Sequence, residues 1–207
     1  DENNRIFVYE GLRRIRAGRC CAGIKALTEV SRKTLSQLVS SDLGFALGPR
    51  LNAAGRLDDM SVGVALLLTN DIGVAREIAN ELDGLNQTRR EIEAGMQEEA
   101  STIFRQFITT QDDLPNGLAI YHPQWHQGVV GILASRIKEK LHRPVIAFAP
   151  SGDGLLKGSG RSIHGVHLRD ALERLNTLNP GLMVKFGGHA MAAGLSLEED
   201  KFPLFQR

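Results

Sequence analysis

PVIAFAPSGDGLLKGSGRSI, residues 144–163, decides the fold class of the second half of the chain. The apolar run 144–148 predicts a buried strand, and residues 154–163 contain another. Working outward, residues 118–121 form a short apolar strand and residues 128–141 carry a helical pattern. Strands that alternate with helices predict a small mixed sheet with helices packed on it, which is an α/β domain.

The flanking segments extend this α/β pattern toward the end of the chain. Residues 168–175 have the apolar spacing of a helix, and residues 182–197 return to strand around Gly-Gly-His. The last residues, 205–207, continue a helical pattern, and the chain begins without Met. We therefore expect a piece of a longer protein.

The first seventy residues have a different pattern, which predicts only helices. Apolar residues at helical spacing predict helices over 4–18, 22–30, 35–44 and 62–68. Residues 48–56, GPRLNAAGR, contain too much Gly and Pro for a regular element, and we expect an irregular loop there.

Residues 71–108 form a long amphipathic stretch between these two parts. Apolar side chains recur at three- and four-residue steps, and charged residues fill the other faces. One helix of this length would span roughly 55 Å at about 1.5 Å per residue. We interpret the stretch as one long helix, or two nearly continuous helices, that connect two lobes, and Gly73, Gly84 and Gly95 weaken it.

Charge is distributed in blocks, although the net charge is only +1. Lys and Arg outnumber Asp and Glu nine to five in 1–50 and nine to four in 121–190, which also holds all six histidines. In 71–113 the acidic residues lead ten to four. Basic lobes suit a polyanionic partner such as nucleic acid. A solvated charged surface is the plainer interpretation.

The length of the apolar runs and the number of cysteines indicate the cellular compartment of the protein. No apolar run is long enough to span a membrane, so no membrane association is expected. The only two cysteines, Cys20 and Cys21, are adjacent, which favours reduced thiols over a disulfide. A cytoplasmic location is expected.

Gly158-Ser159-Gly160-Arg161-Ser162 has the composition of a phosphate site. Successive amides around the two glycines could form an anion-binding nest at a strand edge, and both serines could donate hydroxyls. Arg161 could clamp a phosphate with two parallel hydrogen bonds. The alternative is a glycine-rich hairpin with a surface arginine.

Two histidines accompany further glycine-rich stretches. His189 follows Gly187 and Gly188, and His126 lies in Trp125-His126-Gln-Gly-Val-Val-Gly-Ile132, just before a helix whose N-terminus would favour an anion. Either histidine could instead be structural. All three glycine-rich stretches fall within about seventy residues, which indicates a surface for a nucleotide or nucleic-acid phosphate.

Arg50, Asn52 and Arg56 lie in the expected loop of the first lobe. Two arginines and an amide suit contacts to a nucleic-acid backbone. The alternative is that the arginines pair with nearby aspartates.

Several well-known catalytic motifs are missing from this sequence. It contains no Gly-x-x-x-x-Gly-Lys-Ser/Thr loop, no His-Glu-x-x-His and no Cys-x-x-Cys. From these residues we expect no complete hydrolytic centre in the chain itself.

Taken together, the 48–56 string and the three glycine-rich stretches resemble the bacterial single-strand-specific 5′-to-3′ DNA exonucleases of the DHH phosphoesterase superfamily. The resemblance implies that residues 1–70 are the C-terminal part of a DHH catalytic domain, 71–113 a connector helix and 114–207 a DHHA1 substrate-binding domain. It implies Mn²⁺ or Mg²⁺ in the full-length enzyme, held by residues upstream of this chain. The fragment alone would be inactive and bind no metal.

By the same resemblance, the chain would bind single-stranded DNA and act in DNA repair and recombination, with single-stranded-DNA-binding protein and a helicase as partners. The implied substrate contacts are Ser159, Arg161, Ser162, Gly187, Gly188, His189, His126, Arg50, Asn52 and Arg56. Two alternatives stay open: a phosphodiesterase for short oligonucleotides or cyclic dinucleotides, and a non-catalytic nucleic-acid-binding module.

Overall fold

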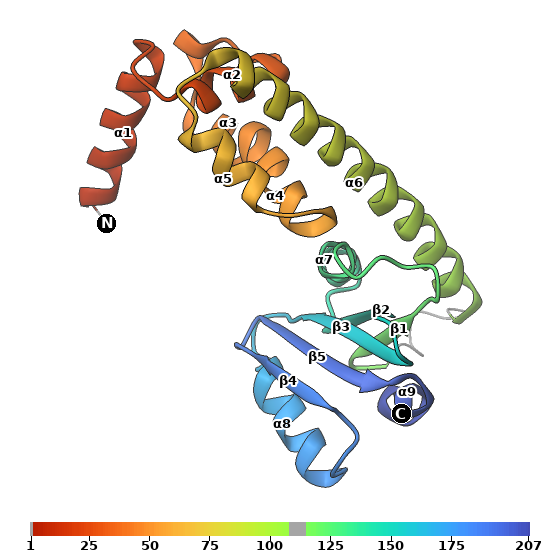
Figure 1. Ribbon diagram of the computed structural model, residues 1–207. Coiled ribbons are helices and arrows are strands. Elements are labelled where there is room, and N and C mark those ends of the chain that lie inside the picture. Colours follow the sequence, from red (N-terminus) through yellow and green to blue (C-terminus); the bar gives the residue numbers. More distant parts are fainter. Residues whose placement is uncertain (1, 108–114) are drawn as a thin grey trace. The chain divides into compact units, whose positions relative to one another are not determined.

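The computed structural model describes residues 2–107 and 115–207, with side chains for all of these except 103–107 (Figure 1). The chain divides into two compact units, Asp1–Glu91 and Ile92–Arg207. The first is helical and the second contains a five-stranded mixed sheet, which confirms the predicted α/β class.

The first unit is built from short helices and turns around one core. The core lies between α2 (Ala22–Val30), α5 (Ser61–Leu68) and the first half of α6 (Ile72–Phe107), around the fully buried Leu27, Leu66 and Leu82. The elements before α6 are α1 (Glu2–Arg16), α2 (Ala22–Val30), η1 (Leu35–Gln37), α3 (Ser40–Asp42), η2 (Leu43–Leu47), α4 (Gly48–Leu57) and α5 (Ser61–Leu68).

The expectation of an irregular loop over 48–56 is wrong, because these residues form helix α4. Pro49 occupies the first turn, where its missing N–H removes no intrahelical hydrogen bond. The preceding π-turn η2 runs directly into α4, so the helix needs no new nucleation. The buried Ala53 and Ala54 then anchor one side of α4 in the core.

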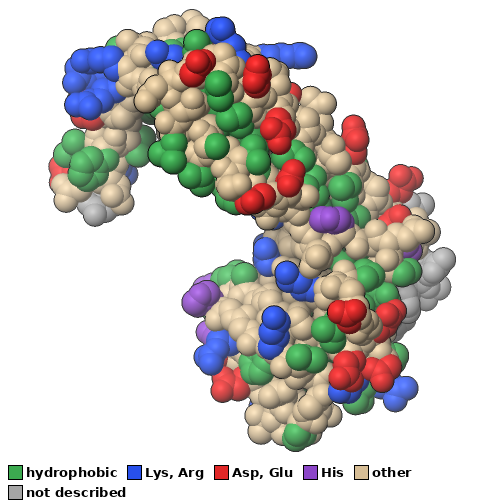
Figure 2. Space-filling model, in the orientation of Figure 1, with side chains coloured by type: hydrophobic (Ala, Val, Ile, Leu, Met, Phe, Trp, Pro, Cys, Tyr) green, Lys and Arg blue, Asp and Glu red, His purple; other side chains and the backbone are tan. Residues whose placement is uncertain are grey.

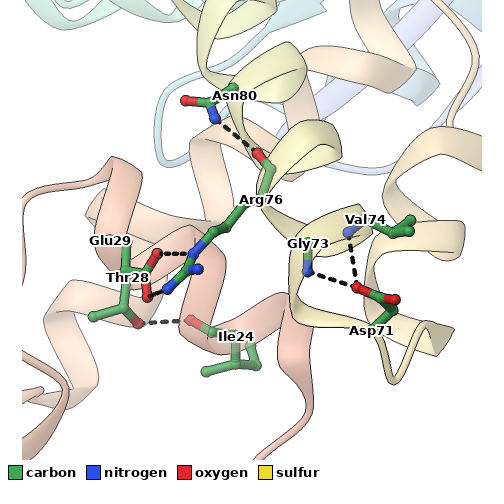
Figure 3. A network of polar contacts seen from close by, with 8 residues as sticks. All are labelled: Ile24, Thr28, Glu29, Asp71, Gly73, Val74, Arg76 and Asn80. Atoms are coloured by element: carbon green, nitrogen blue, oxygen red, sulfur yellow. Dashed lines mark hydrogen bonds and ion pairs between the residues drawn. The ribbon is translucent and has the colours of Figure 1, made fainter.

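Helix α6 (Ile72–Phe107) begins at a side-chain cap and is tied to α2 by an ion pair (Figure 3). Asp71 Oδ1 accepts hydrogen bonds from the amides of Gly73 (2.7 Å) and Val74 (3.2 Å). The Arg76 guanidinium grips the Glu29 carboxylate at 2.7 and 3.0 Å. This hydrogen bonding by Arg76 lowers the pKa of Glu29.

Helix α6 runs without a break for 36 residues. Gly84 and Gly95 do not interrupt it, and no atom outside the helix lies within 4 Å of where their Cβ atoms would be. Its first part belongs to the first unit and its last part to the second. Residues 108–113 of the predicted connector lie outside the described residues.

The second unit is organised by a sheet with strand order β1-β2-β3-β5-β4. The first two strands pair in parallel and the others antiparallel. Its elements after α6 are β1 (Leu118–Tyr121), α7 (Val130–Leu141), β2 (Val145–Pro150), β3 (Leu155–Arg161), α8 (Leu168–Leu178), β4 (Lys185–Gly188), β5 (Ala192–Glu198), η4 (Glu199–Lys201) and α9 (Phe202–Gln206).

The two faces of this sheet are covered differently (Figure 1). One face packs on α8 and α9 and forms the main core, with Phe148, Leu156, Leu172, Leu197 and Phe205. On the other face α7 packs over β2 and β3. That face carries exposed residues on β3, β4 and β5.

Among the helices formed by residues 2–107 and 115–207, none has both the length and the apolar character to cross a membrane.

Candidate nucleic-acid interface

Strand β3 directs Ser159 and Arg161 to the face that carries α7, because alternate residues of a strand share a face. Arg161 Nη1 donates to Ser159 Oγ at 3.1 Å and to the carbonyl oxygen of Gly160 at 2.8 Å. These bonds hold the guanidinium beside the serine hydroxyl.

The first turn of α7 lies directly against this pair. A Cβ atom on Gly131 would stand 2.9 Å from Ser159 Oγ and 3.0 Å from Arg161 Nη2. Gly131 therefore allows the helix to approach the arginine closely. Of the predicted contacts, the structure thus brings the stretch 125–132 and the stretch 158–162 together.

The prediction of an anion nest at Gly158 and Gly160 is wrong. β3 lies between β2 and β5, so the segment is neither at a sheet edge nor in a loop. Both glycines point to the opposite, core face: a Cβ on Gly158 would stand 2.5 Å from the Phe148 ring, and one on Gly160 2.6 Å from Leu168. They make room for packing, which leaves phosphate contacts to the side chains between them.

The stretch 187–189 joins the same face through the register of the strands. Gly187 pairs with Gly194, and Gly194 pairs with Ser159 on the far side of β5. His189, just after β4, donates its amide to the carbonyl of Ala192, the partner of Arg161. Arg161 and His189 therefore end the same row, about 10 Å apart across two strand spacings.

Gly188 and His189 have different surroundings. Gly188 has φ +150°, and a Cβ there would stand 2.4 Å from the carbonyl oxygen of Ala192, so the hairpin requires glycine at this position. His189 itself is exposed. The hairpin places His189 at the surface, at one end of the cross-strand row that runs from Arg161 through Ala192, which we call the arginine row.

Ser162 and His126 stabilise the backbone around the site. The Ser162 hydroxyl, 1% exposed, donates to the carbonyl of Val166 at 2.7 Å. The His126 Nδ1 accepts from the amide of Gly128 at 3.1 Å and shapes the turn that leads into α7. Both side chains thus have intramolecular partners, and no contact to a ligand is needed to explain their position.

The three predicted contacts of the first unit lie on helix α4, where they differ in exposure. Arg50 is mostly buried and its Nε donates to Asp83 at 2.7 Å, while its Nη1 donates to the carbonyl of Ala46 at 2.7 Å. Asn52 and Arg56 are exposed and one helical turn apart. Sequence reasoning considered aspartates near the arginines in sequence and missed Asp83 on α6.

Sequence reasoning also missed two lysines on the sheet. Lys157 and Lys185 flank Ser196 in one cross-strand row, and they line a groove of about 360 Å³ whose floor includes Gly187 and Gly194. Figure 2 shows Lys and Arg side chains over the sheet-bearing part of the chain. The signal available in the sequence was the two-residue spacing of Lys157, Ser159 and Arg161.

The described residues offer no metal centre: no group of three or more His, Cys, Asp or Glu side chains in 2–107 and 115–207 is placed to hold an ion. Two His–carboxylate pairs occur, His122 Nδ1 with Glu99 at 3.7 Å and His167 Nδ1 with Asp170 at 3.1 Å. Glu99 also accepts from Trp125 Nε1 at 2.8 Å. The donor set of the described residues therefore does not fit Mn²⁺ or Mg²⁺.

Comparison with known proteins gives a consistent result. The DHHA1 domain family matches residues 114–207. Over the whole chain, the single-stranded-DNA-specific exonuclease RecJ of Escherichia coli K12 is 72% identical, and the RecJ of Bacillus subtilis is 34% identical over 203 residues. The chain spans 36% of the first of these relatives and 25% of the second.

The fold agrees with solved structures as well. RecJ of Thermus thermophilus in complex with Mn²⁺ matches with a TM-score of 0.80 at 34% identity, and the match covers 98% of this chain and 28% of that one. The same protein in complex with Mg²⁺ matches with a TM-score of 0.79.

Proposed function

Because this chain belongs to the RecJ family along its whole length, we propose that it supplies the strand-binding side of a 5′-to-3′ exonuclease specific for single-stranded DNA. We extend the proposal to the domain division: 1–70 is the end of a DHH domain, 71–113 the connector and 114–207 the DHHA1 domain. One observation carries it. Residues of all three glycine-rich stretches converge on one face of the sheet.

Arg161 and Ser159 are the proposed holders of the 5′-terminal phosphate. A guanidinium presents N–H donors in a plane that matches phosphate oxygens, and Gly131 brings the first turn of α7 alongside it. A terminal phosphate monoester carries between one and two negative charges near neutral pH, more than an internal diester. Arg161, beside the N-terminus of α7, thus favours the 5′-terminal phosphate of the DNA over an internal phosphodiester.

His189 would complete this phosphate site from the other end of its row. The imidazole is exposed and the hairpin that carries it is fixed by Gly188. A hydrogen bond from the ring to phosphate or sugar would position the end of the strand without reading a base. Ser162, Gly188 and His126 would support the site through the backbone.

On the first unit, Asn52 and Arg56 are the proposed backbone contacts, since they are exposed on one side of α4. Arg50 would act indirectly, because its guanidinium is committed to Asp83 and to a carbonyl in its own helix. Its proposed role is to hold α4 against α6, so that the exposed pair is correctly presented.

The rest of the proposal concerns the whole protein. Relatives crystallised with Mg²⁺ and Mn²⁺ support a metal-dependent enzyme whose ligands come from residues outside this chain. On the same relationship we propose DNA repair and recombination as the process and the cytoplasm as the location. Single-stranded-DNA-binding protein and a helicase are proposed partners on the resemblance alone.

Fluorescence anisotropy of the 207-residue chain with 5′-phosphorylated and 5′-hydroxyl single-stranded oligonucleotides tests the proposal. The wild type should prefer the phosphorylated strand, and Arg161→Ala with His189→Ala should remove that preference and weaken binding about tenfold or more. The matched control is Arg169→Ala, which removes one exposed cation from α8 on the other face. Equal binding of both oligonucleotides by the wild type would contradict the assignment of the terminal phosphate.

A further inference from the structure

Two exposed glycines on the α7-bearing face have no structural reason to be glycine. Gly187 and Gly194 pair directly with each other in β4 and β5. A Cβ on Gly187 would meet nothing within 4 Å, and one on Gly194 would meet only the carbonyl oxygen of Gly158 at 3.9 Å. Neither has a positive φ, and both are exposed.

Glycine inside a strand is unfavourable, because it loses backbone entropy and packs nothing. At positions 158 and 188 of the same sheet glycine is required, because any Cβ atom there would clash with its neighbours. Gly187 and Gly194 have no such explanation. A bare strand surface of this kind is typical of a place where a ligand approaches the backbone closely.

Two lysines stand at one end of this bare floor. Lys157, Ser196 and Lys185 form one row across β3, β5 and β4. Both lysines are exposed, and within the described part of the chain neither forms an ion pair. The two unpaired ammonium groups, with backbones about 10 Å apart, raise the positive potential over the groove.

Gly194 and Gly187 lie between the row that contains the two lysines and the row that contains Arg161. Lys157 and Arg161 are four residues apart on β3, which corresponds to about 13 Å along the strand, and the row of Ser159, Gly194 and Gly187 lies midway. Cations at both ends of a flat, uncharged floor suit the backbone of an extended single strand.

We propose that Lys157, Lys185 and Ser196 form a second phosphate subsite, which holds an internal phosphodiester of the same single strand whose terminal phosphate lies at Arg161. The nucleotides between the two phosphates lie over Gly194 and Gly187. Lysine ammonium groups are point charges without planar geometry, so this subsite binds the backbone of any sequence. The inference rests on the function proposed above and gives the strand a direction along β3.

Salt titration of oligonucleotide binding by Lys157→Ala/Lys185→Ala tests the subsite. The plot of log affinity against log salt should become shallower by about 0.7 for each lost phosphate contact, and affinity for a long single strand should fall on the order of tenfold. Affinity for a 5′-phosphorylated nucleoside, which is too short to reach the lysines, should stay unchanged. The control Arg169→Ala/Arg174→Ala removes the same charge from α8.

A second pair of variants separates binding from folding. Gly187→Ala and Gly194→Ala add a Cβ to the floor without a clash inside the protein, so melting temperature should stay level or rise. Affinity for the long strand should nevertheless fall. Unchanged affinity in the lysine and glycine variants, with binding still lost in Arg161→Ala, would overturn the subsite alone. No binding by the wild type would overturn the proposed function and the subsite with it.

Discussion

Gly158→Ala should destabilise the second unit strongly, although it adds one methyl group to a strand. The new Cβ would stand 2.5 and 2.8 Å from two atoms of the Phe148 ring and 2.9 Å from Leu195. The ring cannot move away easily, because it is fully buried with its centroid 5.4 Å from that of Phe202 and 5.3 Å from that of Phe205.

The magnitude follows from overpacking. Inserting a methyl group into a close-packed core typically costs about 1–3 kcal/mol, and contacts this short favour the upper half of that range. Replacing glycine returns roughly 0.5–1 kcal/mol of backbone entropy. The net loss should be about 2 kcal/mol, which lowers the melting temperature of a unit of this size by roughly 8 °C.

Tryptophan fluorescence is the suitable assay, because the single tryptophan, Trp125, is buried in the second unit and reports its unfolding. Gly194→Ala, on the neighbouring strand with an open surface, is the matched control and should leave the melting temperature level or higher. Phe148→Leu should relieve the clash, so the double variant Gly158→Ala/Phe148→Leu should lose less than the sum of the two changes. If Gly158→Ala melted at the same temperature as the wild type and bound DNA more weakly, the packing role would be refuted and the anion-nest interpretation favoured.

Two further predictions concern polar contacts. Arg50→Met should destabilise the first unit by about 2 kcal/mol, since it removes the ion-pair partner of the mostly buried Asp83 carboxylate and leaves it only the hydrogen bond from Gln87; adding Asp83→Leu should recover part of that loss. Urea unfolding followed by far-ultraviolet circular dichroism measures both, and equal stability of Arg50→Met and wild type would contradict the structural role. Burial, and then the hydrogen bond to Glu199, raise the pKa of Tyr121 to about 12. Because this folded pKa exceeds the unfolded value of about 10, the associated stability is present below pH 10 and is lost as the pH rises toward 12. In a Tyr9→Phe background, where Tyr121 is the only tyrosine, tyrosinate absorbance should show this late transition, and a midpoint near 10 would disprove it.

The sequence predicted the elements of the second unit well because their apolar patterns are strong. The strand at 118–121 and the helix and strands around 144–163 all appear in the structure. The long helix was also predictable, since its amphipathic pattern runs for ten turns without a proline. In these segments local pattern and tertiary packing favour the same structure.

The errors came from features that only tertiary structure resolves. Glycine and proline in 48–56 suggested a loop, but proline in a first turn and an alanine-packed side are compatible with a helix. The glycines at 158 and 160 suggested anion binding, whereas core side chains on other elements explain them. Lys157 and Lys185 are far apart in sequence, and strand register alone places them in one row.

The alternation along β3 has an evolutionary consequence. Residues 156, 158 and 160 face the core, and residues 157, 159 and 161 face the side of the sheet that carries α7, so packing residues and proposed phosphate contacts alternate along the strand. A substitution in one set leaves the side chains of the other set on their own face. A single-residue insertion or deletion between 155 and 161 would instead exchange the two faces and turn Lys157 or Arg161 toward the core. The length of this strand should therefore be far less free to change during divergence than its outward-facing side chains.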